Sequence, residues 1–146
     1  MRSLQKLSVL FLCTGNSCRS QMAEGWARHL KGERVRAYSA GIKPRGLDPR
    51  AVEVMAEAGV DISRQRSKHV DELRDVRFDY VVTLCADADE RCPTFPGGAK
   101  SIHVPFDDPP LMARRAKTDD EAMLCYRQVR DEIKAFIQSL PGTLSQ

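Results

Sequence analysis

Residues 7–20 read LSVLFLCTGNSCRS, an apolar run followed by small and turn-forming residues. The run at 7–12 is typical of a central parallel strand that is buried on both faces. The segment 20–31 follows with an apolar stripe at helical spacing, formed by Met22, Ala23, Trp26, Ala27 and Leu30. Gly32 is a plausible end for that helix. The chain therefore begins with a strand, a tight loop and a helix.

The loop at 13–20 has the composition of an anion-binding turn. Thr14, Gly15, Asn16 and Ser17 let the backbone curl so that several N–H groups point at one centre. Such a nest at a helix N-terminus holds an oxyanion. Five residues separate Cys13, which opens the loop, from Arg19, which closes it. The planar guanidinium of Arg19 matches two oxygens of a tetrahedral anion.

The positive potential of this loop acts on its thiol. We expect it to lower the pKa of Cys13, so that the side chain is a thiolate at neutral pH. Ser20 is expected to hydrogen-bond to that sulfur and to cap the helix. Cys18 is interpreted as a packing thiol of the loop. The alternative is an ordinary strand-to-helix turn with one buried cysteine, but the position between a buried strand and a helix favours anion binding.

The rest of the chain alternates between strands and helices. Further strands are predicted at 34–40, 78–84 and 101–106, and short helices at 69–74 and 87–91. Asp48-Pro49 indicates a helix start, 107–110 is predicted to be a loop, and Thr118 begins a long helix that ends near Leu140. This pattern predicts a single α/β domain over 1–146, with helices on both faces of a four-stranded parallel sheet. The loop at 13–20 then lies at the carboxyl edge of the sheet, where such folds bind ligands.

Composition limits the class of protein. The 146 residues are 42% hydrophobic and 29% charged, with a net charge of +3 and 6% aromatic residues. Interleaved charges and few aromatics disfavour a nucleic-acid surface, while the small positive charge favours anionic substrates. The apolar part of 1–12 is short and lacks a small-residue cleavage site, so we expect a cytoplasmic protein without a signal peptide. Five cysteines then indicate redox chemistry or catalysis.

A second informative stretch, LCADADERCP, spans residues 84–93. If the segment between Cys85 and Cys92 is helical, their Cα atoms are ~10 Å apart, whereas a disulfide needs roughly 4.4–6.8 Å. The pair can bridge only if the helix unwinds, which predicts a redox switch. The alternatives are two unrelated cysteines, or a zinc site that adds Cys13 and Cys18. The Cys-x4-Cys and Cys-x6-Cys spacings are unlike those of compact zinc sites.

Four strings carry a resemblance to a known family: CTGNSCRSQMAEGW (13–26), YSAGI (38–42), VVTLCADADERCP (81–93) and FDDP (106–109). Together they resemble thioredoxin-coupled arsenate reductases built on the low-molecular-weight tyrosine phosphatase fold. Phosphatases of this fold share the first and last strings but lack the cysteine pair. The resemblance implies the strand order 2-1-3-4 and a monomer that needs no organic cofactor and no catalytic metal.

The resemblance also implies a mechanism. Arsenate docks in the loop that runs from Cys13 to Ser20, and the Cys13 thiolate attacks arsenic. Asp108 protonates the departing oxygen, with Asp107 as the neighbouring alternative and a solvated turn aspartate as the ordinary interpretation of both. Cys85 then attacks Cys13 and arsenite leaves. Cys92 attacks Cys85, and thioredoxin reduces the resulting disulfide. Cys125 has no assigned role.

Two departures from the family are visible. Some relatives hold potassium through residues that correspond to Asn16, Glu24, Ser39 and an aspartate, whose position corresponds to Lys68 here. The hypothesis is that the Lys68 ammonium takes the place of the cation. The second is the longer stretch 110–117, which brings three basic residues near the site: Arg114, Arg115 and Lys117. We interpret it as a solvated loop.

Three other functions compete with arsenate reduction. A low-molecular-weight tyrosine phosphatase would hydrolyse phosphate monoesters through a Cys13 phosphoenzyme, without needing Cys85 or Cys92. A redox sensor would use Cys13 and Cys85 and would not need Arg19 or Asp108. A reductase with a small thiol as electron donor would not need Cys92.

Overall fold

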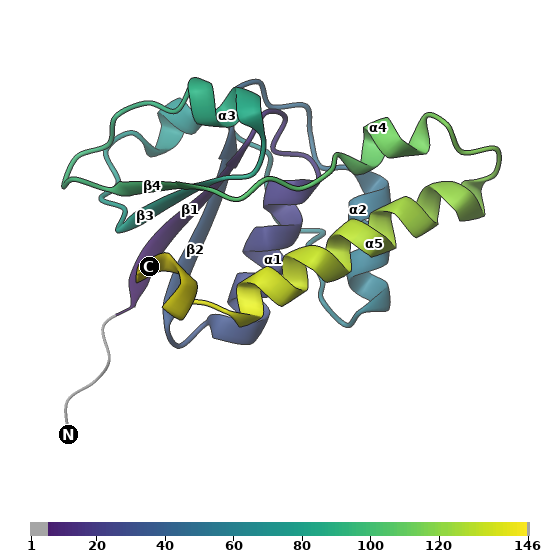
Figure 1. Cartoon of the computed structure of the whole chain (residues 1–146), viewed down its shortest axis with the longest axis horizontal. Helices are drawn as coiled ribbons and strands as arrows, with labels where there is room; N and C mark the ends of the chain where they lie inside the picture. The colour runs from purple at the N-terminus through teal and green to yellow at the C-terminus, as the bar shows by residue number, and fades with distance from the viewer. Residues whose placement is uncertain (1–5, 146) are drawn as a thin grey trace.

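Strand β1 (Leu7–Cys13) lies at the centre of a four-stranded parallel sheet in the computed structural model, which describes residues 6–145 (Figure 1). The other strands are β2 (Val35–Gly41), β3 (Tyr80–Thr83) and β4 (Lys100–His103), in the order β2-β1-β3-β4. The predicted sheet and strand order are confirmed. All the strands are parallel, so the loops that follow their carboxyl ends meet along one edge.

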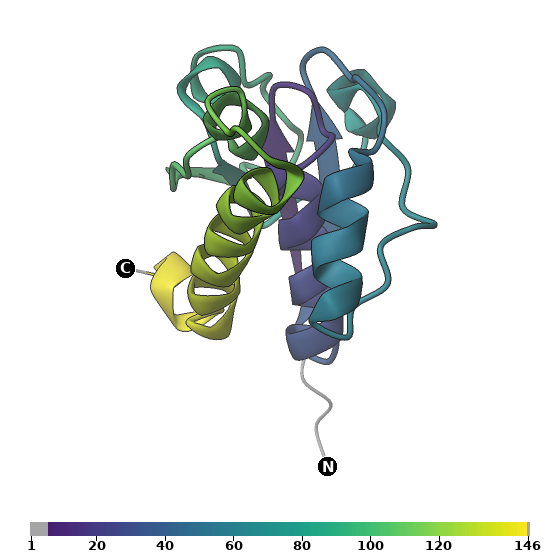
Figure 2. The same cartoon turned by 90° about the vertical axis from the view of Figure 1, so that its right-hand side faces the viewer.

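Helices cover both faces of this sheet (Figures 1 and 2). One face carries α1 (Arg19–Lys31), α2 (Pro49–Glu57) and the long α5 (Asp119–Gln138). The other carries the 3₁₀ helix η1 (Val70–Leu73) and α3 (Ala86–Glu90). The β1 side chains alternate between the two cores. Val9 and Phe11 join the first core, and Leu10 and Leu12 join the second. This alternation explains why the strand is apolar at nearly every position.

The ends of the helices follow local side-chain chemistry. Asp48 accepts a hydrogen bond from the N–H of Arg50 at 3.0 Å and caps α2, as its position before Pro49 predicts. Thr118 accepts from the N–H of Glu121 at 3.1 Å and caps α5. A 3₁₀ turn, η2 (Gly142–Ser145), follows α5 and had no clear signal in the sequence.

The region after β4 differs from the prediction. The strand ends at His103 because Pro105 has no N–H to extend the ladder, although Val104 and Phe106 still donate to Thr83 and Leu84. The predicted loop at 107–110 is wrong for its two prolines, which begin the short helix α4 (Pro109–Ala113). Proline fits the first turn of a helix, where no N–H partner is required. Proline also disfavours the helical conformation in the residue before it, so Asp108 has an extended backbone and takes the N-cap position.

Residues 1–5, at the start of the segment in which we expect no signal peptide, lie outside the described residues. Within 6–145, no helix has both the length and the apolar character that a membrane span requires.

Candidate active site

The loop at 13–20 is held by hydrogen bonds that turn its carbonyl groups outward. Each bond joins a loop oxygen to an N–H of the segment 42–48 that follows β2. The pairs are Cys13 with Ile42 (3.2 Å), Thr14 with Lys43 (2.8 Å), Gly15 with Arg45 (2.9 Å) and Ser17 with Asp48 (2.9 Å). In a trans peptide the N–H points opposite to the C=O. The loop amides are therefore directed toward the centre of the loop, as an anion nest requires.

Asn16 fixes the tightest point of this loop. It has φ of 46°, in the left-handed region that asparagine tolerates better than most residues. Its side chain donates to Ser20 Oγ at 2.8 Å and accepts from the N–H of Lys68 at 2.9 Å. Its carbonyl oxygen accepts from Gln21 Nε2 at 3.0 Å. Asn16 is fully buried, so these bonds are shielded from water and keep the loop in one conformation.

Gly41, in the YSAGI string, allows the loop to lie directly against β2. A Cβ atom at this position would be 2.7 Å from the carbonyl oxygen of Thr14 and 2.9 Å from Asn16 Cβ. Neither contact can be relieved by moving a flexible side chain, because the oxygen is backbone and the position of a Cβ atom is fixed by its backbone. A side chain here would displace the nest.

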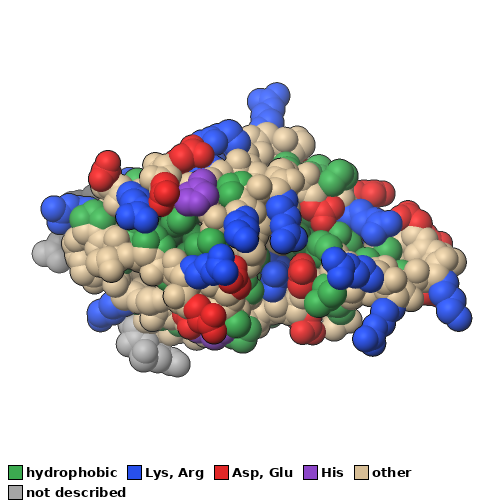
Figure 3. Space-filling view, turned by 90° about the horizontal axis from the view of Figure 1, so that it is seen from above, with side chains coloured by type: hydrophobic (Ala, Val, Ile, Leu, Met, Phe, Trp, Pro, Cys, Tyr) green, Lys and Arg blue, Asp and Glu red, His purple; other side chains and the backbone are tan. Residues whose placement is uncertain are grey.

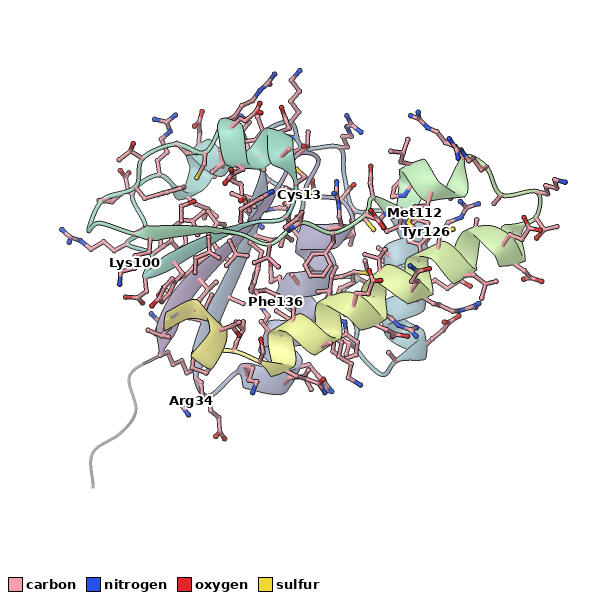
Figure 4. The ribbon with its side chains drawn as sticks, in the orientation of Figure 1. Cys13, Arg34, Lys100, Met112, Tyr126 and Phe136 are labelled. Atoms are coloured by element: carbon pink, nitrogen blue, oxygen red, sulfur yellow. The ribbon has the colours of Figure 1, made fainter. Side chains whose placement is uncertain are left out.

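The loop surrounds a hollow of ≈180 Å³ at the carboxyl edge of the sheet. Cys13 lies at the end of β1, with only 4% of its surface exposed (Figure 4). Arg19 and Asp108 line the same hollow, whereas Asp107 is exposed and is not among its lining residues. The structure thus brings together the nest, Cys13, Arg19 and Asp108. Pro109 and Pro110 at the start of α4 hold Asp108 at the rim.

Arg19 is oriented from two sides. One terminal nitrogen donates to the carbonyl oxygen of Phe106 at 2.9 Å, and the other lies 3.7 Å from Asp108 Oδ1. Its Nε is buried and has no hydrogen-bond partner in the structure. A buried N–H without an acceptor is costly. Arg19 also lines the hollow, which agrees with a site for an anion.

Cys85 lies beside the nest because β1 and β3 are neighbours. Leu12 pairs with Thr83, which places Cys85 next to Thr14 at the ends of the two strands. Thr14 Oγ1 lies 3.1 Å from Cys85 Sγ, and Cys13 is close enough to Cys85 for each thiol to shift the pKa of the other. The nucleophile candidate and the second cysteine are therefore in contact, as their shared sheet edge predicts.

The pKa values of the two thiols are shifted in opposite directions. The hydrogen bond with Cys13 lowers the pKa of Cys85 to about 5 despite partial burial, and Thr14 and Arg19 also favour the thiolate. The hydrogen bond with Cys85 and burial raise the pKa of Cys13, and Arg19 and the loop amide only partly oppose them. The expectation of a lowered pKa for Cys13 is wrong for this resting structure. These shifts favour a thiolate at Cys85, which is less buried, over one at Cys13.

Residues 8–146 match the low molecular weight phosphotyrosine protein phosphatases. The chain belongs to this family. An arsenate reductase of Bacillus licheniformis is 48% identical over 140 residues, covering 96% of this chain and 99% of that protein. A solved arsenate reductase in the phosphate binding state has a TM-score of 0.74 and 28% identity, covering 94% of this chain and 98% of that chain. A thioredoxin-dependent arsenate reductase of Corynebacterium glutamicum has a TM-score of 0.69 and 29% identity, over 97% of this chain and 64% of that one.

The remaining cysteines have distinct surroundings. Cys92 follows α3 and is half-buried on the core face that contains Phe78 and Phe95. Cys18 is 3% exposed in the other core, which agrees with a packing thiol, and burial raises its pKa. Cys125 lies on α5 and donates to the carbonyl oxygen of Glu121 at 3.5 Å. Within 6–145, no three side chains of the usual metal-binding types converge to hold an ion.

Ser20 differs from the prediction. Helix α1 begins at Arg19, with Cys18 in the N-cap position and no side-chain cap. Ser20 lies inside the first turn, where its hydroxyl accepts from Asn16. The predicted cap is wrong because the loop closes one residue earlier than the sequence pattern indicates. Ser20 instead holds Asn16 in its left-handed conformation.

Lys68 lies at the back of the loop. Its ammonium donates to the carbonyl oxygen of Ser39 at 2.9 Å. The hydroxyl of Ser39 donates to Glu24 at 2.6 Å, and Glu24 is 3% exposed. Burial lowers the pKa of Lys68, and the nearby Glu24 opposes that shift. The lysine thus joins Asn16, Glu24 and Ser39 in one cluster.

Sequence reasoning missed two residues of the site. Arg45 lines the hollow from the segment after β2 and was hidden in a turn-rich stretch. Tyr126 of α5 donates to Asp48 Oδ2 at 2.5 Å, and the N–H of Asp48 holds the carbonyl oxygen of Ser17 (Figure 4). Tyr126 has a helical core spacing in the sequence, which carries no signal for this contact.

Basic residues around the site do not form a single patch. Arg114, Arg115 and Lys117 are exposed beyond the end of α4 and do not line the hollow. In the view from above, which faces the carboxyl edge, basic and acidic side chains are interspersed (Figure 3). The interpretation of 110–117 as solvated agrees with this placement, although its first part is helical.

The different pKa values of Cys13 and Cys85 predict the order in which an alkylating agent modifies them. At pH 6 iodoacetamide should modify Cys85 before Cys13, because the Cys85 thiolate is half-exposed while Cys13 is a buried thiol. The rate at Cys85 should fall with decreasing pH, with a midpoint near pH 5. Peptide mass spectrometry after short exposures gives both rates. Earlier modification of Cys13 would place the charge on the other sulfur.

Proposed function

We propose that this chain reduces arsenate to arsenite through a relay of Cys13, Cys85 and Cys92, with thioredoxin as the final reductant. The observation that carries the proposal is the contact of Cys85 with Cys13 over an anion-binding loop. A hydrolytic phosphatase has no use for a second thiol on its nucleophile. Similarity to proteins named arsenate reductases over nearly the whole chain supports the assignment.

The first step forms a bond between sulfur and arsenic. Arsenate, a tetrahedral oxyanion, occupies the nest of Thr14 to Ser20 and is paired with the guanidinium of Arg19, which lines the same hollow. Cys13 passes its proton to the adjacent Cys85 thiolate and attacks arsenic. Asp108 protonates one arsenate oxygen, which leaves as water. The product is a covalent adduct of Cys13 with As(V).

The second step transfers two electrons. Cys85 releases its proton to solvent, which its low pKa favours, and attacks Cys13 Sγ. The sulfur–sulfur bond forms as the sulfur–arsenic bond breaks. The bonding electron pair stays on arsenic, which becomes As(III) and leaves as arsenite. The Cys13–Cys85 disulfide carries the oxidation.

The third step moves the disulfide outward. The Cys92 thiolate attacks Cys85 Sγ, the Cys85–Cys92 bond forms, and Cys13 leaves as a thiolate. The thioredoxin dithiol then reduces Cys85–Cys92 and is itself oxidised. The thioredoxin-dependent relative supports this choice of reductant. The relay uses only thiols of this chain and of thioredoxin, and one copy of the chain supplies all three cysteines, so we propose that it works as a monomer. These thiols have to stay reduced between turnovers, so we propose that the protein works in the cytoplasm.

Phosphate monoester hydrolysis is the alternative function. The nest, Cys13, Arg19 and Asp108 are equally suited to a phosphoenzyme, and the family is named for phosphatases. We expect weak hydrolysis of aryl phosphates as a side activity. It should be lost in Cys13→Ser and retained in Cys92→Ser.

Turnover by cysteine variants tests the relay. With arsenate, thioredoxin, thioredoxin reductase and NADPH, each of Cys13→Ser, Cys85→Ser and Cys92→Ser should lose more than 99% of steady-state NADPH oxidation. Each of these thiols forms a bond that no other group can form. Cys125→Ser is the matched control and should retain wild-type turnover. Persistent turnover in Cys92→Ser would exclude the three-cysteine relay and favour a small-thiol reductant.

We also propose that Lys68 replaces the potassium ion that some relatives bind. The ammonium is a compact, permanently placed positive charge beside Ser39 and Glu24. It supports the loop through Asn16, which accepts from the Lys68 backbone. An added cation would have to displace this ammonium.

Potassium sensitivity tests this role. At constant ionic strength, replacing NaCl by KCl should change neither the melting temperature nor the turnover of the wild type. Lys68→Asp restores the relatives' carboxylate, so potassium should raise its melting temperature by a few degrees. Lys68→Met removes the charge without adding a ligand and is the control. Clear stimulation of the wild type by potassium would contradict the role of Lys68.

A further inference from the structure

Three polar side chains tie α3 to the sheet. The hydroxyl of Thr83, fully buried on β3, donates to Asp89 Oδ1 of α3 at 2.9 Å. His103 Nδ1 of β4 lies 2.9 Å from the same hydroxyl and 3.9 Å from Asp89 Oδ1. These residues come from three elements and none belongs to the anion loop.

The direction of the hydrogen bonds follows from the available protons. A hydroxyl has one proton, and an ionised carboxylate can only accept. Because the Thr83 hydroxyl donates its proton to Asp89, its oxygen accepts the hydrogen bond from His103, and Nδ1 of the histidine carries the N–H. The two hydrogen bonds therefore run in series, from His103 to Thr83 and from Thr83 to the carboxylate of Asp89. Only Thr83 is buried, whereas the side chains of His103 and Asp89 are 35% and 44% exposed, so water weakens the charge-assisted bond at its outer end.

These hydrogen bonds act on the helix that separates Cys85 from Cys92. Asp89 lies between Cys85 and Cys92, in a helix of five residues. The helix has few other restraints: Ala88 is its buried residue, and Asp87 contacts Thr14 and Arg91. A helix this short is not stable by itself. The contacts of its side chains with the sheet therefore determine whether it stays wound.

Cys92 lies just beyond the C-terminal end of the same helix. It lines a separate hollow of ≈330 Å³ together with Asp89, Phe95 and Ser101. Its Sγ donates to the carbonyl oxygen of Pro93 at 3.6 Å. Burial and the nearby Asp89 charge raise the pKa of Cys92. In the resting structure Cys92 is thus a protected thiol, as well as being distant from Cys85.

We propose that the His103–Thr83–Asp89 chain is a latch that positions Cys92: it keeps α3 wound in the resting protein, and its opening sets the rate at which Cys92 attacks Cys85. The inference rests on the proposed relay. The attack forms the Cys85–Cys92 bond and breaks Cys13–Cys85, with the electron pair leaving on Cys13. The segment 86–91 has to unwind first, because Cys85 precedes and Cys92 follows the five-residue helix α3. Helical rise over this spacing keeps their Cα atoms ~10 Å apart, beyond the reach of a disulfide. Loss of the Asp89 tether permits that unwinding and brings Cys92 out of its hollow.

The test uses Thr83→Val, which removes the hydroxyl and nearly conserves shape, with Thr83→Ser as the variant that restores it. In the resting protein, without arsenate or thioredoxin, Thr83→Val should raise the alkylation rate of Cys92 about tenfold. The amides of 86–92 should exchange with deuterium correspondingly faster. Thr83→Ser should behave as the wild type. Glu90→Gln alters an exposed acid of the same helix and should change neither rate.

The second measurement follows the relay itself. After mixing with arsenate and acid quenching, disulfide mapping should show Cys13–Cys85 converting to Cys85–Cys92 about tenfold faster in Thr83→Val. The KM for arsenate should stay unchanged, because the nest is intact. If Thr83→Val does not fold, deuterium exchange of 86–92 in Asp89→Asn carries the test, with a rise expected.

Wild-type alkylation and conversion rates in folded Thr83→Val would overturn the latch. An equal rise in Glu90→Gln would do so too, because it would indicate general weakening of α3. Failure of the proposed function is distinguishable. Turnover that persists in Cys92→Ser would refute the relay and leave the latch no transfer to control, whereas the alkylation and exchange rates report on the tether independently.

Discussion

The site depends on the hydrogen bonds that draw the loop carbonyls toward the segment 42–48. They leave the loop amides directed at one point above the end of β1, where they stabilise an anion together with the guanidinium of Arg19. The other features of the loop serve this arrangement. Gly41 permits close approach, Asn16 accepts the left-handed turn, and Ser20 and Lys68 hold Asn16 in place. Tyr126 supports it from α5 through Asp48.

A second constraint gives the anion site its proposed redox chemistry. Because β1 and β3 pair in parallel, the residues that follow them share one edge, and Cys85 contacts Cys13. In the proposed relay, the low-pKa Cys85 thiolate first accepts the proton of Cys13 and later attacks its sulfur. Cys85 and Cys92 lie at opposite ends of α3, so the proposed relay needs a local change of structure and not a rearrangement of the sheet.

The sequence predicted the parallel sheet and the location of the nest because both depend on local patterns. The apolar run of β1 and the small residues after it have few other stable arrangements. The helix at Pro109 was missed because the restriction that proline imposes concerns Asp108, whereas the prolines themselves fit a first helical turn. The pKa order of Cys13 and Cys85 was missed because it depends on a contact between residues far apart in the chain. Arg45 and the Thr83–His103 contact carry no signal for the same reason.

Disulfide mapping after a single turnover tests the central claim most directly. The reduced wild-type protein is mixed with one equivalent of arsenate in the absence of thioredoxin, blocked with an alkylating agent at low pH, and digested for mass spectrometry. The account predicts one arsenite released per chain, a Cys85–Cys92 disulfide, and Cys13 recovered as an alkylated thiol. Five free cysteines with arsenate unchanged, or arsenite formed without any disulfide between these residues, would contradict it.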